Sequence, residues 1–260
     1  MLAHFIDSKT FQCGYFKDRQ SLFEEYLLED ISEFEFEYLL ANGMRHFGEY
    51  FFRPRCMNCQ ECVPIRLRPE EFCPSRSQKR ALKNCEDIRI HVDEPRFCEE
   101  KFELYLKHKE RFPSLQDDVE DIENFKLSFY ENAPFGVEFE YYWNGKLVGA
   151  ALADWTANSF SAIYTFYVAP KPGMSLGTFS LTSQIQFALQ KSVRYFYMGY
   201  FIFNNPSLKY KAAFRPNEVY IDQEWVPYIN TKGDALLPQS SLAWKNTESL
   251  VKAARKNPLE

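Results

Sequence analysis

The sequence has no stretch that approaches about 18 consecutive apolar residues, so it predicts no membrane-spanning helix. Its N-terminus, MLAHFIDSKTFQCG, has neither a basic start nor an apolar run, and so it does not resemble a signal peptide. Internal repeats and low-complexity tracts are also missing. We therefore expect a cytoplasmic protein without a membrane partner.

Glycine is scarce, at 10 of 260 residues, whereas phenylalanine and tyrosine are abundant, at 25 and 16. Hydrophobic residues make up 45% and charged residues 26%, which is typical of a globular rather than a disordered chain. The length is sufficient for one large domain or two small ones with a buried core.

An excess of positive charge is also missing, since the net charge is −5, which by itself argues against a nucleic-acid partner. Residues 53–83, however, contain eight basic residues against three glutamates, a local charge of +5, so the rest of the chain carries −10. The basic residues are Arg53, Arg55, Arg66, Arg68, Arg76, Lys79, Arg80 and Lys83. Such a patch on an acidic body steers a polyanion, or it is simply a solvated helix face.

Seven cysteines, an odd number without an export signal, argue against structural disulfides. Cys56, Cys59 and Cys62 form a C-x-x-C-x-x-C run. Zinc and iron–sulfur clusters prefer four such ligands, and Cys13 is available as the fourth. The pattern therefore predicts either a metal or cluster site or a turn of reduced, packed thiols.

Periodicity and turn residues predict mixed secondary structure. The expected elements are a helix or strand over 34–42, a strand over 44–52, a helix over 74–84 capped by Ser75, a strand over 87–92, helices over 97–112 and 117–130, a hairpin of 136–143 and 146–155 turning at Asn144-Gly145, a strand over 159–169, a helix over 175–191 capped by Ser175, and a strand over 193–202.

This order matches the core of GNAT-type acyltransferases, in which splayed strands of a mixed sheet receive an activated acyl donor. We predict the α+β class, with an N-terminal cysteine-containing region (1–92), a GNAT-like domain with a mixed sheet (93–225) and a loosely packed tail (226–260). Many α+β domains share such an order, so it defines a fold rather than a function.

Six stretches in fixed order carry a specific resemblance. They are CGYFKDR (13–19), the C-x-x-C-x-x-C-V-P-I-R run (56–66), FCPSRSQKRALKN (72–84), AIYTFY (162–167), SLGTFSLTSQI (175–185) and YMGYFI followed by KYKAAFRPNE (197–218). Over roughly residues 10–220 the chain resembles the arginyl-tRNA–protein transferase family, and within it the short bacterial branch.

The resemblance implies an aminoacyltransferase that moves an amino acid from charged tRNA to the N-terminal amine of a protein beginning with Asp or Glu. The product is a degradation signal of the N-degron pathway. The eukaryotic branch transfers arginine and the bacterial branch leucine. Aminoacyl-tRNA is thus the implied co-substrate and partner, together with proteins bearing N-terminal Asp or Glu, and no DNA is expected.

The sequence departs from the family pattern at three places. Phe16 replaces a second cysteine of the first motif, and His46-Phe47-Gly48 stands where many relatives have Arg-Ser-Gly. Ser207-Leu208 replaces the usual Lys-Met, which leaves Lys209 as the nearest substitute for the missing lysine.

Several residues are candidates for the chemistry. An acceptor carboxylate suits a bidentate arginine, and Arg45, Arg53 and Arg66 match family positions. The tRNA ester is already activated, so catalysis needs positioning, a base and an oxyanion donor. Further candidates are Tyr164, Tyr200 and Lys211 for catalysis, Tyr210 and Lys209 for substrate binding, and Arg76, Arg80 and Lys83 for tRNA. Tyr50, Phe51 and Phe52 are candidates for stacking on unpaired tRNA bases, although a strand with that pattern more often belongs to a core.

Three alternatives remain open at this point. Arginyl transfer on the same scaffold requires acidic partners around the donor side chain, whereas leucyl transfer requires an apolar cavity. A non-catalytic zinc-ribbon-like nucleic-acid-binding protein requires four well-placed ligands. An acetyltransferase requires a glycine-rich phosphate loop, but G-M-S-L-G-T offers only Gly173 and Gly177.

Overall fold

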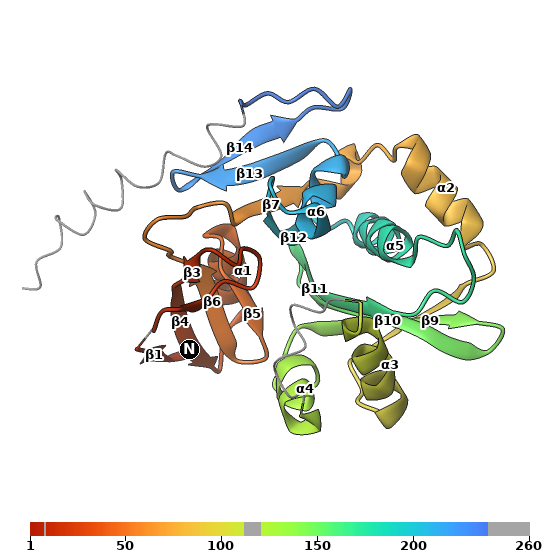
Figure 1. Cartoon of the computed structure of the whole chain (residues 1–260), viewed down its shortest axis with the longest axis horizontal. Helices are drawn as coiled ribbons and strands as arrows, with labels where there is room; N and C mark the ends of the chain where they lie inside the picture. Colours follow the sequence, from red (N-terminus) through yellow and green to blue (C-terminus); the bar gives the residue numbers. More distant parts are fainter. Residues whose placement is uncertain (8, 112–120, 239–260) are drawn as a thin grey trace, which may run out of the picture.

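The computed structural model describes residues 1–7, 9–111 and 121–238 (Figure 1). An eight-stranded mixed sheet forms its centre, in the order β14-β13-β7-β12-β11-β10-β9-β8. The strands are β7 (Val63–Leu67), β8 (Arg89–Asp93), β9 (Gly136–Trp143), β10 (Lys146–Trp155), β11 (Ser159–Tyr167), β12 (Tyr195–Phe201), β13 (Asn217–Ile221) and β14 (Glu224–Ile229). This architecture confirms the predicted α+β class with a mixed sheet.

Helices cover both faces of this sheet (Figure 1). Helix α5 (Leu176–Gln190) packs on one face with α2 (Arg76–Asn84) beside it, and α3 (Glu99–Lys109) and α4 (Ile122–Phe129) lie on the other. Aromatic side chains fill both interfaces. Those on the α5 face include Phe139, Phe160, Phe179 and Phe196, and those on the α3 face include Tyr105, Phe125, Phe129 and Phe166.

The N-terminal lobe contains a four-stranded antiparallel sheet in the order β1-β4-β6-β5. Its elements are β1 (Leu2–Ile6), β4 (Phe23–Glu29), α1 (Glu33–Ala41), β5 (Arg45–Phe47) and β6 (Tyr50–Pro54), with a short hairpin of β2 (Phe11–Gln12) and β3 (Gln20–Ser21) at its side. Leu28, Phe36, Leu40, Met44 and Phe51 form the core of this lobe.

Polar contacts join the lobe to the large sheet. His46 Nε2 lies 2.8 Å from Asp154 Oδ2 on β10, and both side chains are buried. Trp225 Nε1 donates to the Ala41 carbonyl at 2.8 Å, and Thr156 Oγ1 donates to Glu37 at 2.6 Å. Because buried polar groups require partners, these bonds fix the lobe relative to the sheet.

Local signals predicted many elements well. The Asn144-Gly145 hairpin has the predicted bounds, and the ambiguous 34–42 stretch is helix α1. Capping boxes explain two helix starts, with Ser32 and Glu35 at α1 and Ser75 and Gln78 at α2. The predicted cap Ser75 is thereby confirmed.

Other predictions need correction. The single strand over 44–52 is two strands, β5 and β6, because Gly48 turns the chain with φ +53°. Ser175 precedes α5 but its side chain makes no capping hydrogen bond, since its ψ of 68° is not that of an extended cap residue. The parts of the predicted helices at 112 and 117–120, and of the tail from 239, lie outside the described residues.

The large sheet takes strands from both sides of the region boundary expected at residue 92. Strand β7 precedes that boundary and lies between β12 and β13, and strand β8 crosses the boundary. Strand β14 covers Glu224–Ile229 and pairs with β13, so the large sheet extends across residue 226, where the tail was expected to begin. Among the described residues, no helix is long and apolar enough to cross a bilayer.

One feature of the sheet creates the site. Strands β11 and β12 pair in parallel only where Ser159–Ser161 face Tyr195–Tyr197, and beyond these residues they diverge. Gly199 lies in β12 just beyond the pairing, with φ +84°, where the register with β7 shifts. The splay exposes strand edges that would otherwise pair with each other.

Candidate active site

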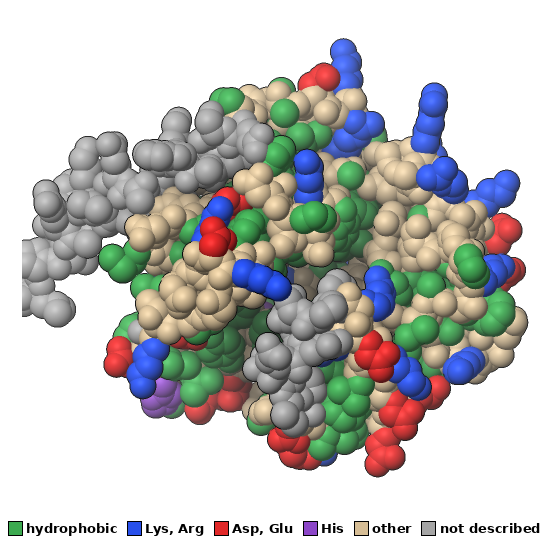
Figure 2. All heavy atoms as spheres, in the orientation of Figure 1, with side chains coloured by type: hydrophobic (Ala, Val, Ile, Leu, Met, Phe, Trp, Pro, Cys, Tyr) green, Lys and Arg blue, Asp and Glu red, His purple; other side chains and the backbone are tan. Residues whose placement is uncertain are grey.

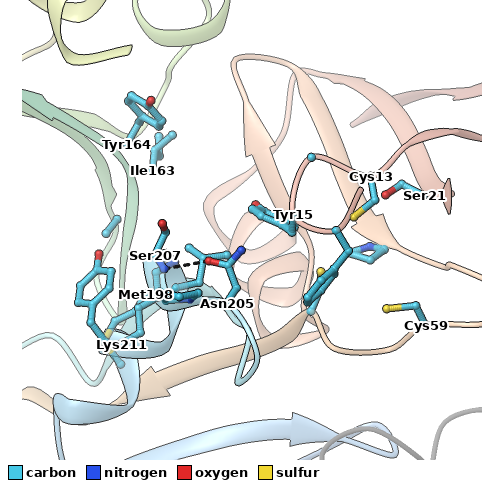
Figure 3. A pocket seen from close by; sticks show the side chains of 18 of the residues that line it. Cys13, Tyr15, Ser21, Cys59, Ile163, Tyr164, Met198, Asn205, Ser207 and Lys211 are labelled. Atoms are coloured by element: carbon cyan, nitrogen blue, oxygen red, sulfur yellow. Dashed lines mark hydrogen bonds between the residues drawn. The ribbon is translucent and has the colours of Figure 1, made fainter. Parts of the chain in front are cut away.

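A cavity of about 820 Å³ lies at the splay, between the N-terminal lobe and the large sheet. Its first wall is formed by some of the residues of the 11–23 segment and of the 54–62 cysteine segment, without Asp18 and Glu61. The second wall includes residues 162–165 and Tyr167 on β11, the start of α5, Met198, residues 205–208, and Tyr210 with Lys211; His108 and Arg111 also line the cavity. Figure 3 shows Cys13, Tyr15 and Cys59 on one side, and Ile163, Met198 and Lys211 on the other.

Two basic side chains hold the diverging strands. Arg45 donates to the Ser161 hydroxyl at 3.1 Å and to the Ala162 carbonyl, whereas Lys211 Nζ donates to the Tyr200 carbonyl at 3.0 Å. A Cβ added to Gly199 would lie 3.2 Å from Lys211 Nζ and 3.7 Å from Arg45 Nε. Glycine at this position therefore leaves the room that both cations occupy.

Lys211 differs electrostatically from an ordinary lysine. Burial lowers its pKa, and the neighbouring Arg45 lowers it further, so that the pKa falls to about 7. The side chain lines the cavity and comes from the 3₁₀ turn Tyr210–Ala213, which follows α6 (Pro206–Lys209). At neutral pH a substantial share of Lys211 is therefore an uncharged amine that can accept a proton.

The predicted tyrosines separate into two groups. Tyr164 and Tyr210 line the cavity, and burial raises the pKa of Tyr164 to about 12. Tyr200 lies outside the lining, because its hydroxyl donates to the Gly43 and Phe52 carbonyls at 3.1 and 3.3 Å. Lys209 also lies outside it, with its ammonium 4.3 Å from the Phe203 ring centre.

The three arginines predicted to bind the acceptor do not line the cavity. Arg53 binds Glu24 through two nitrogens at 2.7 and 2.8 Å. Arg66 pairs with Glu218 at 2.7 Å and stacks on the rings of Tyr195 and Trp225. Arg45 lies behind the lining and binds the strand backbone.

The cavity contains other arginines instead. Arg19, Arg55 and Arg111 line it, although the sequence patterns singled out none of the three for this role. Arg19 follows the Cys13 motif and Arg55 precedes Cys56, so their closeness to the cysteine motifs was the available signal. Gln60 also lines the cavity, and its buried side-chain amide has no hydrogen-bond partner among the described residues.

The four predicted ligand cysteines all line the cavity. Cys56 Sγ accepts from the Leu22 backbone N–H at 3.4 Å, and Cys59 Sγ accepts from Arg19 at 3.2 Å. Burial, reinforced by the neighbouring thiols, raises the pKa of Cys62 and keeps it protonated. The cysteine segment thus anchors the 13–22 segment that forms the same wall.

The described side chains do not support the predicted zinc or iron–sulfur site. No group of three or more His, Cys, Asp or Glu residues in the described part of the chain is arranged to hold a metal ion. The hydrogen bonds that the Cys56 and Cys59 sulfurs accept are compatible with packed, reduced cysteines, the alternative that the sequence pattern left open.

The aromatic residues that were candidates for base stacking do not form an exposed surface. Phe51 and Phe52 are buried in the lobe, and Tyr50 donates its hydroxyl to Glu25. The burial of Phe51 and Phe52 agrees with the alternative that a strand with that pattern belongs to the core. Among the residues lining the cavity, the exposed aromatics are Phe11, Tyr15 and Tyr210.

The basic stretch separates into two parts with different environments. Arg53, Arg55, Arg66 and Arg68 all form ion pairs with glutamates. The α2 residues Arg76, Lys79, Arg80 and Lys83 are exposed, and none has an ion pair with a residue that the structure describes. Lys and Arg side chains project from the surface over α2 (Figure 2).

The lining of the cavity has no Asp or Glu among the described residues. Ile163, Leu181 and Met198 provide an apolar surface beside Lys211 and the splay. An uncharged apolar side chain can be buried here, whereas a guanidinium would lack a carboxylate partner.

Comparison with known proteins gives the class of this site. The family model for the N terminus of arginine-tRNA-protein transferases matches residues 11–80, and the model for the C terminus matches residues 100–221. The chain belongs to this family, which places it among the aminoacyltransferases and sets aside the non-catalytic zinc-ribbon alternative.

Named relatives refine the comparison. An aspartate/glutamate leucyltransferase from Pseudomonas fluorescens SBW25 is 34% identical, over 85% of this chain and 95% of its own length. One from Pseudomonas putida KT2440 is 32% identical over the same shares. A solved structure described as L-PGS from Bacillus licheniformis is similar at a TM-score of 0.42 and 14% identity, over 68% of this chain and 52% of that one, too distant to bear on function.

Removing one thiol tests the role of the cysteine segment. We expect Cys59→Ala to lower the free energy of unfolding by about 1 kcal/mol, because Arg19 loses a hydrogen-bond acceptor. Transfer per folded molecule should change little, since attack on an activated ester requires no thiol. Thermal denaturation and turnover are compared with Cys98→Ala, an exposed thiol outside the cavity. A fully folded Cys59→Ala variant that transfers nothing would contradict this assignment.

Proposed function

We propose that the protein transfers leucine from Leu-tRNA to the N-terminal amine of proteins beginning with Asp or Glu. Family membership supports aminoacyl transfer from tRNA, and the names of the relatives support this donor and these acceptors. The observation that carries the proposal is the acid-free, partly apolar cavity at the splay, with Lys211 beside it. We propose further that the modification takes place in the cytoplasm and marks the acceptor proteins for degradation.

The reaction requires little beyond positioning and proton transfer. The acceptor α-amine attacks the ester carbonyl carbon, a C–N bond forms and the bond to the terminal ribose oxygen breaks. The proton lost by the amine passes to neutral Lys211, and the leaving ribose oxygen takes up a proton as it becomes a hydroxyl. The hydrogen bond from Lys211 to the Tyr200 carbonyl fixes its amine at the splay.

Leucine fits the cavity better than arginine. Ile163, Leu181 and Met198 can cover a branched alkyl side chain, and burial of such a chain is favourable by roughly 1.5–3 kcal/mol. A donor guanidinium would lie near Arg45 and Lys211 without a compensating carboxylate in the lining. Arginyl transfer therefore becomes the second candidate.

Helix α2 suits the phosphate backbone of tRNA. Its four exposed cations are free of ion pairs within the described structure, and α2 packs beside α5, whose first residues line the cavity. Lys and Arg contacts to phosphates provide affinity without sequence reading and make binding depend on salt. The tRNA body would lie over α2 while its aminoacyl end enters the cavity, where Tyr210 and Tyr15 offer exposed rings.

A substrate panel tests the proposal directly. Radiolabelled Leu-tRNA should label peptides that begin with Asp or Glu, because the free amine and the carboxylate are both required. Peptides that begin with Ala or Asn, or that are acetylated, should remain unlabelled, and acetyl-CoA should donate nothing. Preferred transfer from Arg-tRNA would establish the second candidate, and equal labelling of an Ala peptide would exclude the proposed acceptor class.

The α2 assignment predicts a change in salt dependence. Replacing Arg76, Arg80 and Lys83 with alanine should raise KM for tRNA and reduce the slope of log affinity against log salt by about 3. The fold should be retained, because the three side chains are exposed. Arg89, Lys107 and Lys146, which are exposed on other elements, provide a control with the same charge change. An unchanged slope would show that the α2 cations are only solvated and do not contact tRNA.

The role of Lys211 predicts a pH profile. Its pKa of about 7 means that the ammonium predominates below pH 7, so single-turnover transfer should rise with pH through this value. Lys211→Met should lower the maximal transfer rate by about 10²-fold or more. The remaining pH dependence should come only from deprotonation of the acceptor α-amine, at a pKa of about 8. Lys209→Met, outside the lining, is the control. A mutant profile of unchanged shape would show that another group takes the proton.

A further inference from the structure

We propose that Arg55 binds the side-chain carboxylate of the acceptor's first residue, and so determines the preference for Asp and Glu. This inference rests on the proposed function and adds the residue that selects the acceptor. Arg55 lies at the end of β6, lines the cavity and has a side chain that is 35% exposed. A guanidinium recognises a carboxylate through two parallel hydrogen bonds.

The other arginines of the cavity are already engaged. Arg19 Nη1 donates to Glu61 at 2.9 Å, so one guanidinium is paired with one carboxylate. The Arg19 guanidinium also lies over the Phe16 ring. Arg111 directs one terminal nitrogen to His108 Nδ1 at 3.3 Å and the other to the Tyr167 hydroxyl at 3.2 Å. Neither has both terminal nitrogens available for a bidentate contact.

Arg55 differs because its carboxylate partner is shared. Glu24 accepts from Nε and Nη2 of Arg53 and also from Nε of Arg55, at 2.7, 2.8 and 2.7 Å. One negative charge therefore faces two guanidiniums, which leaves an excess of one positive charge on this wall. Burial alone would raise the pKa of Glu24, but the two arginines outweigh it and hold the pKa at about 2.

The terminal nitrogens of Arg55 complete the site. Only its Nε is used by Glu24, and within the described structure Nη1 and Nη2 make no hydrogen bond. Because no Asp or Glu lines the described cavity, an incoming carboxylate meets no competitor there. Glu24 orients the guanidinium from behind, and the two outer nitrogens remain for a ligand.

A peptide carboxylate fits Arg55 better than a tRNA phosphate. Arg55 belongs to the N-terminal wall. Helix α2, which carries the exposed cations, lies beyond α5 and away from the N-terminal lobe (Figure 1). The acceptor must also place its amine at the splay, and its first side chain extends from the same carbon atom that carries that amine. A carboxylate bound on the facing wall therefore orients the amine toward Lys211.

The experiment compares Asp and Asn at the first position of otherwise identical peptides. Direct peptide binding by fluorescence anisotropy and leucyl transfer from Leu-tRNA are both measured for the wild type and for Arg55→Gln. We expect Arg55→Gln to weaken binding and kcat/KM for the Asp peptide by roughly 10- to 100-fold, the range of a charge-assisted contact. The Asn peptide and KM for tRNA should change little.

Arg53→Gln is the matched control, because Arg53 binds the same Glu24 outside the cavity. It should retain the discrimination between Asp and Asn. Arg55→Lys retains the positive charge but lacks the two parallel N–H donors of a guanidinium, so it should retain only part of the discrimination between Asp and Asn. This variant keeps the test valid if Arg55→Gln folds poorly. Thermal denaturation of all three variants reports on folding.

The outcomes separate this inference from the proposed function. If the wild type transfers leucine but Arg55→Gln still discriminates fully, the inference is wrong and the function stands. If the wild type binds Asp peptides through Arg55 but transfers no leucine, the function is wrong and the inference stands. A rise in KM for tRNA alone would show that Arg55 binds a phosphate. Equal losses of discrimination in Arg53→Gln and Arg55→Gln would show that Arg53, Arg55 and Glu24 have only a structural role. Both results overturn the inference.

Discussion

The divergence of β11 from β12 is the constraint on which the rest of the site depends. Three paired residues on each strand hold the strands together, and beyond them the ladder ends. Arg45 and Lys211 bind the backbone carbonyls of Ala162 and Tyr200 beyond this point. The stabilisation of the splay therefore brings two cations to its edge, and Gly199 provides the space they occupy.

Placing cations together at low exposure has a chemical consequence. Two positive charges in a partly buried site repel, and arginine cannot release its proton in the accessible pH range. Lysine can, and the pKa of Lys211 is lowered mainly by burial, with the repulsion from Arg45 adding to the effect. The same arrangement that holds the strands apart thus supplies an amine able to accept a proton where an acyl group would be bound.

The N-terminal lobe completes the cavity rather than standing apart from it. Its cysteine segment anchors the 13–22 segment through sulfur acceptors at Cys56 and Cys59, and together they form the wall that faces the splay. The C-x-x-C-x-x-C pattern therefore has a geometric role in forming this wall. The arginines around it pair with Glu24, Glu61 and Glu218, and so much of the local positive charge is neutralised within the fold.

Local interactions explain what the sequence determined by itself. The Asn144-Gly145 hairpin, the capped start of α2 and the apolar periodicity of α5 depend on neighbours a few residues apart, and all were predictable. The ordered motifs also sufficed to indicate the family. Strands β7, β13 and β14 were not anticipated, because a short strand inside a sheet is defined by partners far along the chain. The same reason governed the site: Arg53 and Arg55 are two residues apart, but only the tertiary structure decided which one lines the cavity. The charged residues of a sequence can be counted. Whether an arginine is free to bind a ligand depends on the carboxylates that other strands place beside it, and only the folded chain determines that.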